Sequence, residues 1–280
     1  MYMVAGKCAY LAGEPERTST LFAELMRRVN TNVERAEIQR EQVYALASHG
    51  RFHDAVKVVI EALAALGHPL SMEDIQSPQV LMGEIAQIQT NLRGRRIAEV
   101  IDAPETKDPV IRAVLAILDS IGDGAHHLGP VAFSILNLRA VNIALVHGNT
   151  ELVVNPYVCT GYMLAAIRGR VVEGMEFCKL AEAINNKFPS PAQAARLVFV
   201  TASAAHMQNS MRHVAQLFAT ARQRCIETGE IHLLGVSCFL GTMAHLFAGD
   251  QLEDLLDLAG KNLAIVRRTN MPNASSTALR

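Results

Sequence analysis

Residues 45–67 carry apolar side chains at the spacing of two α-helices separated by a turn. Gly50 supplies the flexible position at which the backbone turns, and Phe52 follows it at the corner of the hairpin. The helix expected over about residues 53–66 carries one apolar stripe, formed by Ala55, Val59, Ala62 and Leu66. A single hairpin cannot bury such a stripe, so we expect other hairpins to pack against it.

The same pattern recurs along the chain. Gly13 precedes Gly50 by 37 residues, and Gly169, Asn209 and Gly249 follow one another at intervals of 40. Each of these turn positions is followed by apolar residues at helical spacing. Repeats of roughly 34–45 residues with two helices each are typical of helical solenoids.

The repeats are degenerate. A small residue is expected where the second helix of a hairpin approaches the first, as Ala55 does, but the equivalent later positions hold Gly174, Val214 and Asp254. We therefore predict an all-α fold, a tetratricopeptide-like solenoid of antiparallel helix hairpins, with departures from strict tetratricopeptide geometry.

Cap residues set the expected helix limits. Thr31 and Glu34 predict a capping box for a helix that ends near Ser48. Four pairs of a capping residue and a proline predict helix starts, at Ser77–Pro78, Asp108–Pro109, Asn155–Pro156 and Ser190–Pro191. The other helices are expected over about 1–12, from 15 onward, 97–101, 130–146, 171–186, 211–228, 231–248 and 251–268. The stretch 231–248 is apolar nearly all round, which predicts a helix sandwiched between neighbours.

The domain organisation is expected to be one helical-repeat array over residues 1–280. It could divide into sub-lobes 1–121 and 130–280, joined by the glycine-rich loop 119–130. The first expected helix has no capping residue before it, and the last residues carry no helix stop signal. We expect both ends to be cuts through a longer protein.

Composition excludes several classes of protein. Apolar residues make up 50% and charged residues 19%, so the chain is not disordered, and the net charge of −1 gives no basis for binding nucleic acid or an anionic membrane. Five scattered cysteines form no C-x-x-C pair, which argues against a disulfide framework or a zinc site. Without a signal peptide or an apolar run of about 18 residues, a cytoplasmic location is expected by default.

No motif for catalysis or nucleotide binding is present. The sequence lacks a phosphate loop, G-x-G-x-x-G, H-E-x-x-H, G-x-S-x-G and the protein kinase signatures. We therefore assign no catalytic, cofactor-binding or metal-binding residue and expect no cofactor in this segment. An autonomous enzyme is not expected, although an enzyme with an unrecognised helical active site stays an alternative.

A few residues are candidates for functional sites. Asp123, His126 and His127 could hold a metal, but adjacent side chains do not converge easily on one ion, so solvated histidines are favoured. The basic cluster Arg93–Arg96 could bind a phosphate or an acidic partner, but a solvated helix end is favoured. The remaining candidates read as packing or surface residues: His206, His213, His232, His245, Cys225 and Cys238.

Two segments, Arg96–Pro109 (RIAEVIDAPETKDP) and Arg139–Asn149 (RAVNIALVHGN), carry a resemblance to a known family. Together with GRFHDAVKVVIEALAALGHPL and GYMLAAIRGRVVEGMEFCKLA, they resemble the helical-repeat region of large bacterial and fungal signalling proteins. Those proteins combine Ser/Thr kinase-like, predicted AAA-type ATPase, GAF and sensor histidine kinase domains.

The resemblance implies a non-catalytic scaffold or relay segment of a multidomain sensor kinase-ATPase. Its partners would be neighbouring domains of the same polypeptide or a protein or peptide, and ATP would bind only elsewhere in the parent protein. Two other hypotheses stay open: a free-standing adaptor that binds a peptide, and the sensor arm of an ATPase-type transcription regulator.

Overall fold

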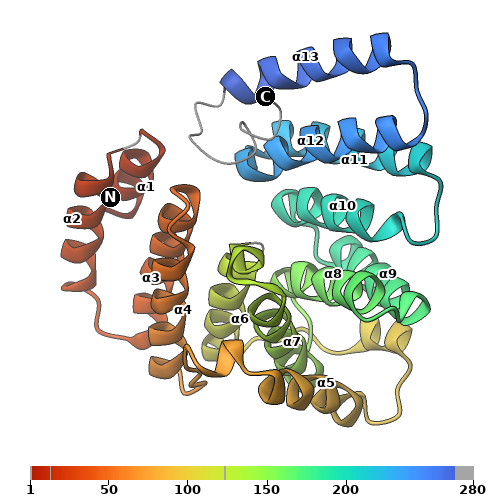
Figure 1. The fold of residues 1–280 in the computed structure, drawn as a ribbon. Coiled ribbons are helices and arrows are strands. Elements are labelled where there is room, and N and C mark those ends of the chain that lie inside the picture. Colours follow the sequence, from red (N-terminus) through yellow and green to blue (C-terminus); the bar gives the residue numbers. More distant parts are fainter. Residues whose placement is uncertain (1, 13, 123, 269–280) are drawn as a thin grey trace. The chain divides into compact units, whose positions relative to one another are not determined.

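The computed structural model describes residues 2–12, 14–122 and 124–268 (Figure 1). Within these ranges the chain is all helical and contains no β-strand, so the predicted all-α class is confirmed. The chain forms two compact units, of which the first holds residues 1–94 and 103–156 and the second holds residues 95–102 and 157–280. The chain therefore passes between the units three times, at 94–95, 102–103 and 156–157.

The helices of the first unit are joined mostly by short turns. In chain order they are α1 (Tyr2–Leu11), α2 (Pro15–Met26), α3 (Asn32–Ser48), α4 (Phe52–Ala65), η1 (Asp74–Gln76), α5 (Pro78–Leu92), α6 (Pro109–Gly122), η3 (Gly124–Leu128), α7 (Pro130–His147), η4 (Glu151–Val153) and the start of α8 (Val154–Tyr162). The second unit contains η2 (Ile97–Asp102), the rest of α8, the π-helical turn η5 (Met163–Ile167), α9 (Val171–Lys187), α10 (Pro191–Ala205), α11 (Met211–Thr228), α12 (Ile231–Phe247) and α13 (Leu252–Arg268).

Side-chain caps begin several helices where the sequence predicts them. Thr31 and Glu34 form the complete capping box at the start of α3. Ser77 and Ser190 each accept a hydrogen bond from the backbone N–H three residues further on, and Asp108 accepts from the first N–H groups of α6. These side chains satisfy N–H groups that a helix start leaves without a backbone partner.

The pair Asn155–Pro156 does not begin a helix, contrary to the sequence prediction. The chain becomes helical earlier, because Thr150 lies in extended backbone and its hydroxyl accepts a hydrogen bond from the N–H of Leu152 at 3.5 Å. A short 3-10 turn, η4, covers Glu151–Val153, and α8 follows it directly from Val154. Asn155 is consequently buried in the first turn of α8 rather than at its cap.

α7 is the central helix of the first unit. It packs against α5 and against α6, whose last residues, 119–122, are helical and belong to the glycine-rich segment 119–130 that was expected to be a loop. That segment therefore joins helices of one unit, and the unit boundaries differ from the expected sub-lobes 1–121 and 130–280. Of the described helices, α7 alone is long and apolar enough to cross a membrane, and 72% of it is buried inside the structure, as is usual for a core helix.

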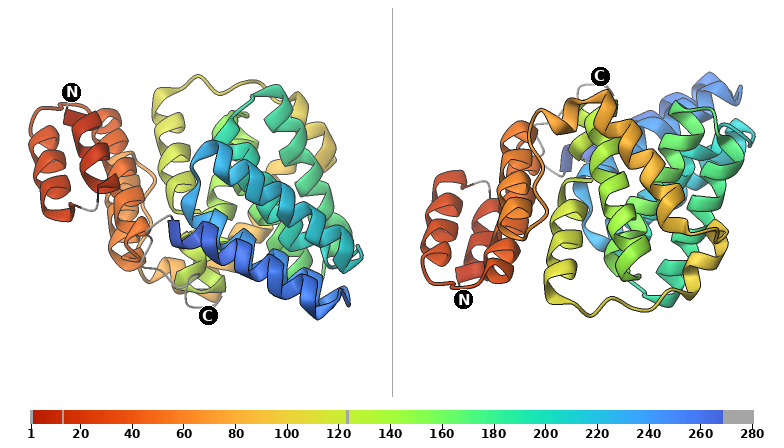
Figure 2. Two further views of the ribbon diagram at one scale, coloured as in Figure 1. Left: turned by 90° about the horizontal axis from the view of Figure 1, so that it is seen from above. Right: turned by 90° about the horizontal axis from the view of Figure 1, so that it is seen from below.

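Consecutive helices pack as hairpins in both units. In the first unit, α1 packs on α2 and α3 packs on α4. In the second, α10, α11, α12 and α13 pack in succession, and the left view of Figure 2 shows α11 to α13 side by side. Gly50, Gly169 and Gly249 turn the chain with φ of +74°, +69° and +77°, a region that favours glycine. Gly13 lies outside the described residues, and Asn209 lies in the turn between α10 and α11 without a positive φ.

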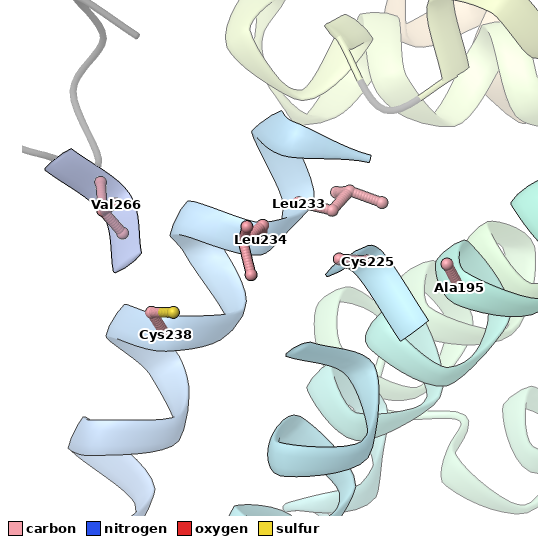
Figure 3. Packing of buried hydrophobic residues seen from close by; sticks show 6 residues of the cluster. All are labelled: Ala195, Cys225, Leu233, Leu234, Cys238 and Val266. Atoms are coloured by element: carbon pink, nitrogen blue, oxygen red, sulfur yellow. The ribbon is translucent and has the colours of Figure 1, made fainter. Parts of the chain in front are cut away.

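The expected sandwiching of α12 is confirmed. α12 lies between α11 and α13, and one apolar cluster spans four helices (Figure 3). Its buried members are Ala195 of α10, Cys225 of α11, Leu233, Leu234 and Cys238 of α12, and Val266 of α13.

A close helix contact of the second unit forms around two glycines. A Cβ on Gly174 of α9 would lie 2.5 Å from the carbonyl oxygen of Gly161 in α8, and a Cβ on Gly161 would lie 2.6 Å from that of Gly174. No side chain fits between these backbones, so the small residue expected at position 174 is a packing requirement.

Candidate functional site

A groove of about 520 Å³ runs between α5 and α7 in the first unit. This volume falls within the range of roughly 300–1,000 Å³ that is common for small-molecule sites. Side chains from α5, from α7 and from the turn after α4 line the groove, namely His68, Val80, Gly83, Glu84, Gln87, Arg139, Asn142, Ile143, Val146 and His147.

A carboxylate lies at the base of the groove with both of its oxygens engaged. Arg139 Nε donates to Glu84 Oε1 at 2.6 Å, and Asn142 Nδ2 donates to Glu84 Oε2 at 2.8 Å. Asn142 Nδ2 also donates to the backbone carbonyl of Glu84 at 3.0 Å. Because positions 139 and 142 are three residues apart on α7, their side chains reach α5 from the same face of the helix.

The polar contacts continue along α5. Asn91 Nδ2 donates to Asn142 Oδ1 at 3.0 Å and to the Asn142 carbonyl at 3.3 Å, and Gln87 Nε2 donates to Asn91 Oδ1 at 2.9 Å. Glu84, Gln87 and Asn91 are spaced by three and four residues, so they share one helical face. A connected polar network therefore links α5 to α7.

Burial makes this network costly unless it stays intact. Glu84 and Asn91 are each 8% exposed and Asn142 is 6% exposed, whereas the Arg139 side chain is 28% exposed at the groove wall. Removing water from a charged pair costs several kcal/mol, so such a pair is weak support for stability by itself. The intact network instead fixes the register of α5 on α7 and presents Arg139 to the groove.

Two histidines lie near Arg139 at the groove. Burial lowers the pKa of His68 from its ordinary value of 6.5, and the nearby His147 and Arg139 lower it further. His147 is exposed at the C-terminal end of α7. The side chains of His68, His147 and Arg139 are thus close enough for their positive charges to repel one another.

Directly after His147, the chain pairs with a distant segment. Asn149 N–H donates to the carbonyl of Pro104 at 2.9 Å, and Thr106 N–H donates to the carbonyl of Asn149 at 3.1 Å. Gly148 has φ of +108°, and a Cβ there would lie 2.2 Å from the Pro104 oxygen. Glycine is therefore required for this isolated β-bridge.

The two histidines considered as metal ligands, His126 and His127, each contact an aromatic ring. His127 stacks on Phe52 with ring centroids 4.0 Å apart, and His126 meets Phe133 edge-on at 5.6 Å. Asp123 lies outside the described residues. In the described part of the chain, no three His, Cys, Asp or Glu side chains are placed to hold a metal ion.

The arginines after α5 are divided between the two units, because the boundary between the units falls at residues 94–95. Arg93 is exposed and ends α5 with a left-handed φ of +52°, and Gly94 follows at +79°. Arg96 Nε donates to Glu99 Oε1 at 2.8 Å, which compensates one of the three charges. Arg96 and its neighbour Arg95 belong to the second unit, while Arg93 belongs to the first.

The other histidines have local roles. His206 Nδ1 lies 2.7 Å from the carbonyl oxygen of Ser203, and His245 Nδ1 lies 2.7 Å from Asp250 Oδ2. His213 is exposed, and the side chain of His232 lies outside the described part of the structure.

The two cysteines weighed from the sequence are buried. Cys225 and Cys238 belong to the apolar cluster of the second unit, as predicted. Burial raises the pKa of the Cys238 thiol to about 11, which makes it unreactive at neutral pH.

Sequence reasoning did not identify the groove, because its two walls are more than 50 residues apart in the chain. One signal was available. Arg139 and Asn142 are two of the four polar residues in the mostly apolar stretch 130–146, beside Ser134 and Asn137, and a polar side chain inside a buried helix needs a partner. Their partner Glu84, by contrast, has no distinguishing sequence context.

No protein-family model matches this chain, and no curated protein matches it either.

Proposed function

We propose that this chain is a tetratricopeptide-like scaffold and relay segment of a multidomain sensor kinase-ATPase, without catalytic residues of its own. Its partners would be neighbouring domains of the same polypeptide or a protein or peptide segment. The proposal starts from the resemblance of segments 96–109 and 139–149 to that class of signalling protein.

The observation that carries the proposal is the contact between these two segments. Residues 104–106 and Asn149 are held together by the β-bridge, although they are more than 40 residues apart in the chain. Next to the bridge, Arg112 donates to Thr150 Oγ1 at 3.0 Å and to Glu151 Oε1 at 2.6 Å. Two segments that stand out in the sequence thus form one structural junction.

The junction also lies where the chain leaves one unit for the other. Residues 95–102, immediately before it, belong to the second unit, where η2 packs on α9 and the Ile101 carbonyl accepts a hydrogen bond from Lys187 Nζ at 2.8 Å. With three chain connections, a rearrangement in one unit has several covalent routes to the other. This connectivity suits a relay better than a single flexible linker would.

The packing of successive hairpins supports the tetratricopeptide-like part of the proposal. Consecutive helices contact one another, and small residues lie at the closest helix approaches, as at Ala55 and Gly174. Stacked hairpins of this kind transmit local changes to their neighbours and offer an extended surface for binding.

The first test is the coding sequence on both sides of this segment. An upstream ATPase with a phosphate loop and a downstream histidine kinase would support the relay. Stop codons directly against both ends would overturn it and favour an independent binding protein.

A second test concerns the junction in the full-length protein. Thr106→Pro removes the N–H that pairs with Asn149, whereas Lys107→Ala changes an exposed neighbour and leaves the bridge intact. We expect Thr106→Pro, but not Lys107→Ala, to change the rate of autophosphorylation in the folded protein. Equal rates of autophosphorylation in both variants and in the unsubstituted protein would contradict a relay through the junction.

A further inference from the structure

The base of the α5–α7 groove presents a cation with unused hydrogen-bonding capacity. Arg139 contacts Glu84 through Nε, and its Nη1 and Nη2 have no hydrogen-bond partner among the described residues. A guanidinium group offers five N–H donors, and its terminal nitrogens bind carboxylates and phosphates well. Since the side chain is 28% exposed, these nitrogens are accessible from the groove.

The acidic side chains near Arg139, Glu84 and Asp74, already accept hydrogen bonds from other groups of the protein. Glu84 accepts from Arg139 and Asn142 through its two oxygens, and Asp74 of η1 accepts from the N–H and hydroxyl of Ser71. Both carboxylates are therefore directed toward hydrogen bonds within the protein. An added anion at the terminal nitrogens of Arg139 would not need to displace either one.

We propose that this groove binds a small amphipathic acid. The anionic head, a carboxylate or a phosphate, lies at the terminal nitrogens of Arg139. His68 and His147 flank the head and donate hydrogen bonds to it when they are protonated. The proximity that lowers the pKa of His68 in the free protein becomes favourable once a negative charge lies among these groups.

The apolar body of the ligand lies on aliphatic side chains of the same groove. Val80 comes from α5, and Ile143 and Val146 come from α7, where they lie about one helical turn apart. Val146 is 50% exposed, so a bound apolar group would remove its surface from water. Apolar walls with a few convergent polar groups are the usual composition of a small-molecule site.

This inference deepens the relay proposed above and rests on it only for what binding would trigger. The groove lies beside the junction, since His147 of the groove directly precedes Gly148 and Asn149 of the β-bridge. A ligand at the groove would thus act on the end of α7 that holds the two segments together.

The test is calorimetric titration of the whole 280-residue chain with 4-phenylbutyrate and with phenyl phosphate. The uncharged 4-phenylbutanamide serves as the matched control ligand. We expect saturable binding of at least one acid, and binding of the amide about tenfold weaker or worse, because the amide lacks the negative charge that pairs with Arg139. Whichever acid binds more tightly identifies the head group as carboxylate or phosphate.

Two variants locate the site without disturbing the buried network. Val146→Asp places a negative charge at an exposed position of the groove, and Val172→Asp makes the same change at a position that is 74% exposed in the second unit. We expect Val146→Asp to weaken binding by about tenfold and Val172→Asp to leave it unchanged. Binding should also raise the pKa of His68, which NMR of its ring protons reports.

Three results would overturn the proposal: equal affinity for the acid and the amide, equal effects of the two aspartate variants, or no saturable binding up to about 10 mM of either acid. None of these results bears on the coding sequence around the segment or on the Thr106→Pro test. Failure of the ligand site is therefore distinguishable from failure of the relay.

Discussion

The α5–α7 contact of the first unit and the contacts among α11, α12 and α13 in the second unit use different types of side chain. Between α5 and α7, Glu84 and Arg139 form an ion pair inside a network of amide side chains. Among α11, α12 and α13, apolar residues pack together, and one buried amide, Asn262, ties the three helices.

The difference lies in what each arrangement can do. Apolar contacts tolerate exchange among residues of similar size and specify little beyond burial. A buried charge requires particular partners at particular positions, and here it also leaves a cation facing a groove. We infer that the second unit is mainly a packed support, whereas the α5–α7 pair combines support with recognition.

The largest effect is expected in the apolar core of the second unit. Phe218 of α11 is 4% exposed and meets Phe199 edge-on at 6.0 Å. Phe218→Ala should lower the free energy of unfolding by about 3–5 kcal/mol, because it removes apolar contacts and leaves a cavity. Urea denaturation followed by circular dichroism measures this loss.

The control for this prediction is Phe247→Ala at a position that is 69% exposed. It should change the free energy of unfolding by no more than about 0.5 kcal/mol. Similar losses in the two variants would contradict the packing described for α11.

The next effect is expected from the ion pair of the first unit. Arg139→Met leaves the buried Glu84 carboxylate without its charged partner and should lower the free energy of unfolding by about 3 kcal/mol. The double variant Glu84→Met/Arg139→Met should recover most of that loss, because no uncompensated charge remains. If the double variant were less stable than the single variant Arg139→Met, the ion pair would be stabilising in itself.

A smaller effect compares two buried amides. Asn142 donates to the Glu84 carboxylate at 2.8 Å, and Asn262 Oδ1 accepts from the Arg222 guanidinium at 2.8 Å. Asn142→Ala and Asn262→Ala should each lower the free energy of unfolding by about 2 kcal/mol, because each variant loses a hydrogen bond to a charged group. A loss below about 1 kcal/mol in either variant would mean that its charged partner adds nothing.

The smallest effects are expected in the pH dependence of stability. The pKa of His68 is lowered in the folded protein, so the unfolded chain takes up the proton first as pH falls through 6.5. His68 should therefore contribute stability above pH 6.5 that is lost below it, and His68→Gln should remove this dependence. Denaturation at pH 7.5, 6.5 and 5.5 tests the sign.

The second unit should respond in a different pH window. Hydrogen bonding to His245, then to Arg212, lowers the pKa of Asp250 below its ordinary 3.8. The stability that this carboxylate contributes is present above pH 3.8 and is lost as pH falls below it. Asp250→Asn should flatten the pH dependence of stability in that acidic range. An unchanged acid slope would contradict this role of the carboxylate.

Local sequence signals were enough to predict most of the helices. Helix starts such as Ser77–Pro78 and the capping box at Thr31 were recognised because each depends on residues within a single turn. The prediction for Asn155–Pro156 failed because a competing cap at Thr150 starts the chain into a helix first.

Long-range pairing was not predictable in the same way. Nothing near Glu84 indicates that its partners are Arg139 and Asn142, because the contact depends on how α5 crosses α7. The apolar pattern likewise placed 119–130 between lobes, whereas burial of α7 against α6 holds both sides of that segment in one unit. Periodicity reports which face of a helix is buried, but not which helix covers it.

The interleaving of the two units has a consequence for biosynthesis. A ribosome releases the chain from its N-terminus, and residues 1–94 emerge before α7, their main central helix, exists. Residues 95–102 stay without their packing partner for longer still, because α9, on which η2 packs, is synthesised about 70 residues later. The nascent chain therefore carries the open α5 face until residue 147 has emerged, and its demand for chaperones should be greatest in that interval.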